Sequence, residues 1–138
     1  TKPEAVRLSK SLKLKNIKFI TNLPIKELAV QMNKAKIILG IFGTSQKSNN
    51  VIPNKVYDAL SSRKPIITAK TQTHAELFKN GKDIILINPN NAKMLAGAIQ
   101  KMLLDIILRD KIAKGGYLLY KKRLTPEKVV SSLIKYLK

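Results

Sequence analysis

Residues 36–41 read KIILGI, an unbroken apolar run with several β-branched side chains. Such a run is typical of a strand that is buried on both faces of a parallel sheet. Three further short apolar runs predict strands at residues 17–20, 65–68 and 83–87, and segments with helical spacing separate them. This alternation predicts an α/β fold with a Rossmann-like, doubly wound parallel sheet flanked by helices.

The predicted helices have apolar residues at helical spacing. They cover residues 3–13, 24–33, a segment from Pro53 through Leu60, 73–79, 91–103, 105–120 and 126–137. The last three have no strand between them, so residues 91–137 are expected to form a helical C-terminal tail of the same domain. Residues 43–52 show no periodic pattern and predict a long loop, which in a compact domain is often functional.

The chain has 138 residues, enough for one domain with its own core. It begins with Thr1, and its first predicted helix follows at once. We therefore expect a single domain over residues 1–138 that is a piece of a longer protein. The longest apolar runs are only a few residues, and the start does not resemble a signal peptide. This predicts a cytoplasmic chain, peripheral to a membrane if it meets one.

The composition excludes several kinds of site. There is no cysteine, so disulfides, thiolate zinc sites and cysteine nucleophiles are excluded, and the single histidine, His74, excludes a histidine metal cluster.

The 27 Lys and Arg exceed the 8 Asp and Glu, which gives a formal charge of +19. Coding bias, an anionic membrane surface and nucleic acid are three explanations of this charge. Only four of the 27 cations are arginine, which disfavours nucleic acid.

Three predicted loops leave the carboxyl ends of the strands, where open parallel sheets bind their ligands. They cover residues 21–23, 43–55 and 69–73 and are rich in Thr, Ser, Asn, Gly and Lys. The second runs into a helix whose first turn contains Asn54 and Lys55, and free N–H groups there favour an anion such as phosphate. Asp58 is expected on the same side of that helix. An exposed ion pair between Lys55 and Asp58, without a binding role, is the alternative interpretation.

The same stretch resembles a known family. Residues 41–45 and 51–68 read IFGTS and VIPNKVYDALSSRKPIIT. They resemble the nucleotide-sugar-binding segment of retaining GT-B glycosyltransferases, family 4 in particular, in which a Pro-Asn-Lys start leads into a helix with a central carboxylate. Residues 71–78 and 88–99 are similar to the segments that follow it in the family, so the resemblance covers nearly the whole chain.

The resemblance implies a role for each matching residue. Asp58 would bind the nucleotide ribose, and Asn50 stands where other members have a second carboxylate. Loop amides and the helix start would hold the diphosphate, residues 21–23 would face the base, and Glu76 would lie near the donor loop. The implied donor-binding residues are Thr21, Asn22, Gly43, Thr44, Ser45, Asn54, Lys55, Asp58 and Glu76.

The resemblance also implies an activity. A hexose would pass from a UDP- or GDP-type donor to a glycan or lipid-linked acceptor, without a metal or other cofactor, and no Asp-x-Asp motif is present. The resemblance implies the C-terminal domain of a GT-B fold without its first strands. An N-terminal GT-B domain would be the partner that completes the cleft, so no catalytic residue is assigned to this chain. Two alternatives remain. One is a related nucleotide-sugar epimerase or a non-catalytic nucleotide-binding domain, and the other is a basic module that binds nucleic acid or a membrane surface.

Overall fold

A computed structural model describes residues 2–134, and the chain divides into two compact units at residues 30 and 31. The first unit contains α1 (Lys2–Ser11), an irregular segment and the start of α2 (Ile25–Lys34). The strand predicted at residues 17–20 does not form, and Phe19 and Ile20 are exposed. That prediction was wrong because an apolar run forms a strand only beside a partner strand, and the described part of this unit offers none.

The second unit is built on a three-stranded parallel sheet. Its strands are β1 (Ile38–Leu39), β2 (Ile66–Ala69) and β3 (Ile85–Ile87), and they lie side by side in that order. Ile38 pairs with Ile66, and Ile67 pairs with Ile85. These strands confirm the parallel sheet predicted from residues 36–41, 65–68 and 83–87.

The burial of the strands follows their places in the sheet. All four residues of β2, the central strand, are fully buried. Leu39 of β1 is 40% exposed, so the prediction that this strand is buried on both faces was wrong. β1 lies at the edge of the described sheet and has a neighbour on one side only. Gly40 lets β1 approach β2, because a Cβ there would overlap the Thr68 hydroxyl.

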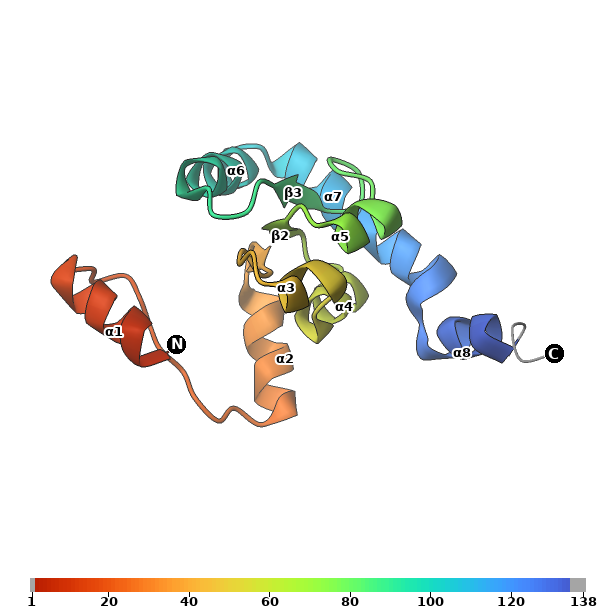
Figure 1. The fold of residues 1–138 in the computed structure, drawn as a ribbon, viewed down its shortest axis with the longest axis horizontal. Helices are drawn as coiled ribbons and strands as arrows, with labels where there is room; N and C mark the ends of the chain where they lie inside the picture. The colour runs from red at the N-terminus through yellow and green to blue at the C-terminus, as the bar shows by residue number, and fades with distance from the viewer. Residues whose placement is uncertain (1, 135–138) are drawn as a thin grey trace. The chain divides into compact units, whose positions relative to one another are not determined.

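Helices cover both faces of this sheet. After β1 come α3 (Gln46–Asn50) and α4 (Asn54–Ser61), α5 (Gln72–Leu77) follows β2, and α6 (Ala92–Leu104) and α7 (Ile106–Leu119) follow β3. A π-helical segment, η1 (Tyr120–Leu124), and α8 (Pro126–Ile134) end the described chain. Figure 1 shows α6 and α7 on one side of β2 and β3, with α3 and α4 on the other.

Neighbouring residues of each strand enter different cores, as expected for a three-layer fold. Ile66 and Leu86 belong to a core shared with α4 and α5, and Ile67 and Ile87 to a core shared with α6 and α7. Sequence and structure therefore agree on an α/β layered fold with a helical tail. Residues 135–137 of the last predicted helix lie outside the described residues.

Two local features differ from the sequence prediction or refine it. Residues 43–52 are not a patternless loop but contain α3, because Ser45 caps that helix by accepting a hydrogen bond from the backbone N–H of Ser48. Gly81 adopts a left-handed backbone conformation, with φ of 75°, which glycine allows because it has no Cβ. None of the helices formed within residues 2–134 is long and apolar enough to cross a bilayer.

Candidate functional site

The carboxyl ends of the three strands meet at one edge of the sheet, and the predicted loops at residues 43–55 and 69–73 leave this edge. The third predicted loop, residues 21–23, does not follow a strand, so that part of the prediction was wrong. The loops after β1 and β3 are joined at this edge. The backbone N–H of Asn90 donates to the carbonyl oxygen of Phe42 at 3.2 Å, and the Asn90 amide nitrogen lies 3.5 Å from the hydroxyl oxygen of Thr44. These contacts hold the loops after β1 and β3 together.

A second set of hydrogen bonds folds the loop of residues 43–45 onto α3. The hydroxyl oxygen of Ser48 is buried and lies 3.0 Å from the carbonyl oxygen of Gly43 and 2.6 Å from that of Ser45. The Ser45 hydroxyl accepts from the backbone N–H of Ser48 at 3.2 Å. Gly43, Thr44 and Ser45 themselves are exposed. Ser48 therefore holds the loop against α3, and the loop is open to solvent on its outer side.

A polar cleft of about 570 Å³ lies between α3 and the start of α5. The Thr73 hydroxyl donates to the carbonyl oxygen of Asn49 at 2.7 Å, which ties its two walls together. The Gln72 amide donates to the carboxylate of Glu76 at 2.9 Å and orients it. The lining residues are Asn49, Asn50, Lys70, Thr71, Gln72, Thr73 and Glu76. Amides, hydroxyls, one carboxylate and one ammonium group suit a ligand with many hydroxyl groups.

A buried histidine fixes the wall that carries Glu76. The hydroxyl oxygen of Thr71 caps α5 by accepting from the backbone N–H of His74, and it lies 2.6 Å from Nδ1 of the His74 ring. The ring is fully buried beside Phe78, and its Nε2 has no hydrogen-bond partner within the described residues. Burial lowers the pKa of His74 below its ordinary value. His74 is therefore neutral and structural.

α4 begins at the same edge of the sheet, because it lies between the end of β1 and the start of β2. Val56 and Leu60 are buried and Asn54, Lys55 and Asp58 are exposed, so the predicted division of this helix into two faces is confirmed. Pro53 supplies no side-chain cap, so no side chain of this residue competes for the N–H groups of the first turn. Within residues 2–134, Lys55 and Asp58 form no ion pair with each other.

Asn54 and Asp58 line a second, largely apolar cleft of about 460 Å³ between α4, η1 and α8. Tyr57 and Tyr120 contribute aromatic rings to it, and burial raises the pKa of Tyr57. Among the predicted site residues, Glu76 lines the polar cleft, whereas Asn54 and Asp58 line this one. Asn54 and Asp58 therefore line a different cleft from Glu76.

The remaining predicted residues have other positions. Lys55 lines neither cleft, and residues 43–45 form the loop that leads into α3. Thr21 and Asn22 are exposed residues of the first unit, and Asn22 has a left-handed backbone with φ of 55°.

Six lining residues of the polar cleft were not predicted as site residues: Asn49, Asn50, Lys70, Thr71, Gln72 and Thr73. The loop at residues 69–73 was predicted to bind a ligand because it follows a strand. Nothing in the sequence showed that α3 would lie opposite this loop. No group of three or more His, Asp or Glu side chains placed to hold a metal occurs in the part of the chain described.

The family of this chain follows from a sequence match over most of its length. Residues 2–119 match the family described as Glycosyl transferases group 1. The chain belongs to this family. No curated protein matches the chain.

Several solved structures share the fold of this chain. Anabaena Alr3699/HepE in complex with UDP-glucose has a TM-score of 0.80 at 20% identity, over 98% of this chain and 36% of that one. Sucrose-phosphate synthase from Thermosynechococcus elongatus has a TM-score of 0.81 at 18% identity, over 98% and 34%. The C-terminal domain of a glycosyl transferase group 1 protein (LpcC) from Francisella tularensis has a TM-score of 0.65 at 20% identity, over 91% and 63%.

The fold is therefore that of a GT-B C-terminal domain, as the sequence predicted. The chain spans about a third of HepE and of sucrose-phosphate synthase, and 63% of the LpcC domain.

Proposed function

We propose that this chain is the donor-binding half of a retaining, family 4-like hexosyltransferase that uses a UDP- or GDP-linked sugar. The observation that carries the proposal is the polar cleft at the carboxyl edge of the sheet, because its amide, hydroxyl and carboxylate groups suit a sugar. The family match supports a transferase, and the HepE structures hold UDP-glucose and UDP.

In this proposal the parts of the donor have separate contacts. The loop amides of residues 43–45 and the start of α4, with Asn54 and Lys55, bind the diphosphate, since a helix start offers free N–H groups and a positive dipole end. Asp58 accepts hydrogen bonds from the ribose hydroxyls. Glu76 and the polar cleft bind the sugar, and Thr21 and Asn22 contact the base.

The contribution of this half to the reaction is orientation and charge stabilisation. As the bond between sugar and diphosphate breaks, negative charge grows on the diphosphate, and fixed N–H groups and Lys55 stabilise it without a metal ion. The acceptor site and the group nearest the reacting carbon belong to an N-terminal GT-B domain. We propose a glycan or a lipid-linked acceptor, a cytoplasmic location, and an anionic membrane surface as a further partner.

The test is calorimetric titration of the chain with UDP and with GDP, with and without a chelator. We expect the chain to bind either UDP or GDP, with the same affinity in the presence and in the absence of the chelator. Lys55→Ala should weaken that binding several-fold, and Lys111→Ala, which removes an exposed lysine of α7, should leave it within about twofold. Strict dependence on a divalent ion, or equal losses in the two variants, would contradict the proposal.

A further inference from the structure

A groove of about 360 Å³ lies between the turn at residues 79–83 and the end of α7 with η1. Four cationic side chains line it, Lys79 and Lys82 from the turn and Lys122 and Arg123 from η1. We propose that this groove binds the phosphate head group of an anionic lipid. This inference rests on the membrane partner proposed above and assigns that partner a binding site. It does not depend on nucleotide binding.

The charges of the groove favour an anion. All four cationic side chains are exposed, and none forms an ion pair with another of residues 2–134. The one carboxylate in the lining, Asp83, is buried and accepts a hydrogen bond from the backbone N–H of Lys79 at 2.9 Å. That carboxylate is engaged by the turn. Among residues 2–134, no carboxylate therefore neutralises these cations, and they can bind an anionic ligand.

The groove also has an apolar wall, which points to an amphiphile. Leu77 and Leu119 line it and pack against the first core, and Leu118 is 55% exposed beside them. Cations next to exposed apolar surface are the combination by which proteins bind the interface of an anionic bilayer. A second copy of this chain is a poor occupant, because it carries the same charge of +19.

The two sides of the groove are held at a fixed separation. A Cβ on Gly115 would overlap the carbonyl oxygen of Lys82, and a Cβ on Gly116 would lie 2.6 Å from that of Asp83. α7 therefore lies directly against the backbone of the turn. Since Gly81 also adopts its left-handed conformation there, the turn and its two lysines are placed by backbone contacts, not by flexible side chains alone.

The π-helical turn of η1 supplies the other two cations. It follows α7 directly, and Lys122 and Arg123 from it line the groove. Such turns are rare and are often found at functional sites.

The groove lies at the opposite edge of the sheet from the polar cleft. The turn at residues 79–83 precedes β3, so it lies at the amino ends of the parallel strands, and the polar cleft lies at their carboxyl ends. A bilayer bound at the groove would leave the cleft open to solvent. Lipid binding and donor binding are therefore separable by experiment.

The experiment is co-sedimentation of the full chain with vesicles of phosphatidylcholine alone or with one quarter phosphatidylglycerol, in about 0.1 M salt. We expect binding only to the anionic vesicles. Lys79→Ala/Lys82→Ala should weaken it about thirtyfold, since each cation near an anionic bilayer contributes about a fivefold gain in partition. The control, Lys93→Ala/Lys101→Ala on α6, removes equal charge outside the groove and should cost less than about fivefold.

Three further measurements distinguish a lipid from a free phosphate and the lipid site from the donor site. Glycerol phosphate at constant ionic strength should not release the chain, and Leu118→Ser should weaken binding several-fold. The Lys79→Ala/Lys82→Ala variant should bind UDP as the wild type does. The lipid site would be overturned if both lysine-pair variants lost vesicle binding equally, or if glycerol phosphate released the chain. It would also be overturned if the chain bound both kinds of vesicle equally or bound neither. Loss of UDP binding in the Lys79→Ala/Lys82→Ala variant would separately contradict the donor proposal.

Discussion

Asp58 is the residue on which the donor proposal can be tested most directly. It is an exposed carboxylate on α4, makes no ion pair with Lys55 within residues 2–134, and lines the cleft between α4, η1 and α8. A charge-assisted hydrogen bond to a ribose hydroxyl contributes about 1.5–3 kcal/mol. Asp58→Asn should therefore weaken UDP or GDP binding about tenfold or more in a calorimetric titration.

The matched control for this substitution is Asp110→Asn, which neutralises an exposed carboxylate of α7. Both variants should keep the wild-type unfolding midpoint, because neither side chain is buried. Unchanged nucleotide affinity in Asp58→Asn would assign Asp58 to the solvated surface and end its proposed ribose role.

His74 makes the stability of the second unit sensitive to pH. Burial lowers its pKa in the folded state, so below about pH 6.5 the unfolded chain takes up a proton that the folded chain does not. The free energy of unfolding should be level above that pH and fall below it, by at most about 1.4 kcal/mol per pH unit. Denaturant unfolding at pH 7.5, 6.5, 5.5 and 5.0 measures this slope.

The comparison variant is His74→Gln, which removes the titrating ring. Its overall stability should be lower, because Thr71 loses the ring nitrogen, but its slope between pH 6.5 and 5.0 should be flatter than that of the wild type. Glu127 does not disturb this window, because its hydrogen bond with the Thr125 side chain keeps the pKa of its carboxyl below the ordinary value. A slope equal to that of the wild type would show that His74 does not control the pH dependence.

At the scale of the elements, short-range patterns predicted most of the second unit. The apolar runs at residues 65–68 and 83–87 became β2 and β3, and the stripe of Val56, Ala59 and Leu60 became the buried face of α4. These patterns were informative because they are set by burial against a core that this unit itself contains. Asn91, Asp105 and Thr125 all act as helix caps, each accepting a backbone N–H.

Features that depend on distant contacts were not predictable in the same way. Residues 17–20 have a strand-like composition, but a strand needs a partner that the sequence cannot show. The helix α3 depends on a serine cap inside a polar segment, and the polar cleft depends on the contact of Thr73 with Asn49 across 24 residues. The family resemblance predicted donor-loop positions, but it did not predict that Glu76 and Asp58 would line separate hollows.

The junction of α7 with the turn at residues 79–83 gives a test at this scale. Gly115→Ala should destabilise the chain by about 1–3 kcal/mol, because its Cβ would overlap the backbone of Lys82. Gly97→Ala on α6 is the matched control, since a Cβ there meets no atom within 4 Å. It should stabilise the chain by up to about 1 kcal/mol through helix propensity. Equal effects in denaturant unfolding would contradict the close approach of α7 to this turn.

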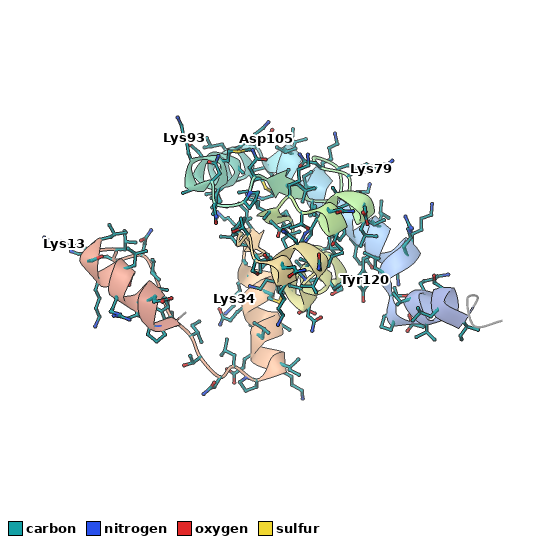
Figure 2. All side chains as sticks on the ribbon, in the orientation of Figure 1. Lys13, Lys34, Lys79, Lys93, Asp105 and Tyr120 are labelled. Carbon is teal, nitrogen blue, oxygen red and sulfur yellow. The ribbon has the colours of Figure 1, made fainter. Side chains whose placement is uncertain are left out.

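Across the whole molecule, the two edges of the sheet have different chemistry. The carboxyl edge carries the polar cleft with Glu76, and the amino edge carries the cationic groove with Lys79 and Lys82. In Figure 2, Lys34, Lys79 and Lys93, which come from three separate parts of the chain, project away from the ribbon, and all three are exposed. Much of the charge of +19 is therefore spread over the surface, so charge alone does not identify a binding site.

This unbalanced charge leads to a prediction about stability and salt. Folding brings the cations closer together than in the unfolded chain, and self-repulsion then opposes folding. The Debye length falls from about 30 Å at 0.01 M salt to about 8 Å at 0.15 M, so added NaCl should raise the thermal midpoint by about 3 °C or more over that range. Differential scanning fluorimetry in NaCl and in KCl measures the shift, which should be the same for both salts.

Lys93→Gln tests the cause of that shift. Lys93 is exposed in the first turn of α6, where the helix dipole also disfavours a cation. The substitution should raise the midpoint at 0.01 M salt and have a smaller effect at 0.15 M, because salt already screens both interactions there. A midpoint that falls as NaCl rises would mean that attractive charge contacts outweigh repulsion in the folded chain, and the +19 would then stabilise the fold instead of opposing it.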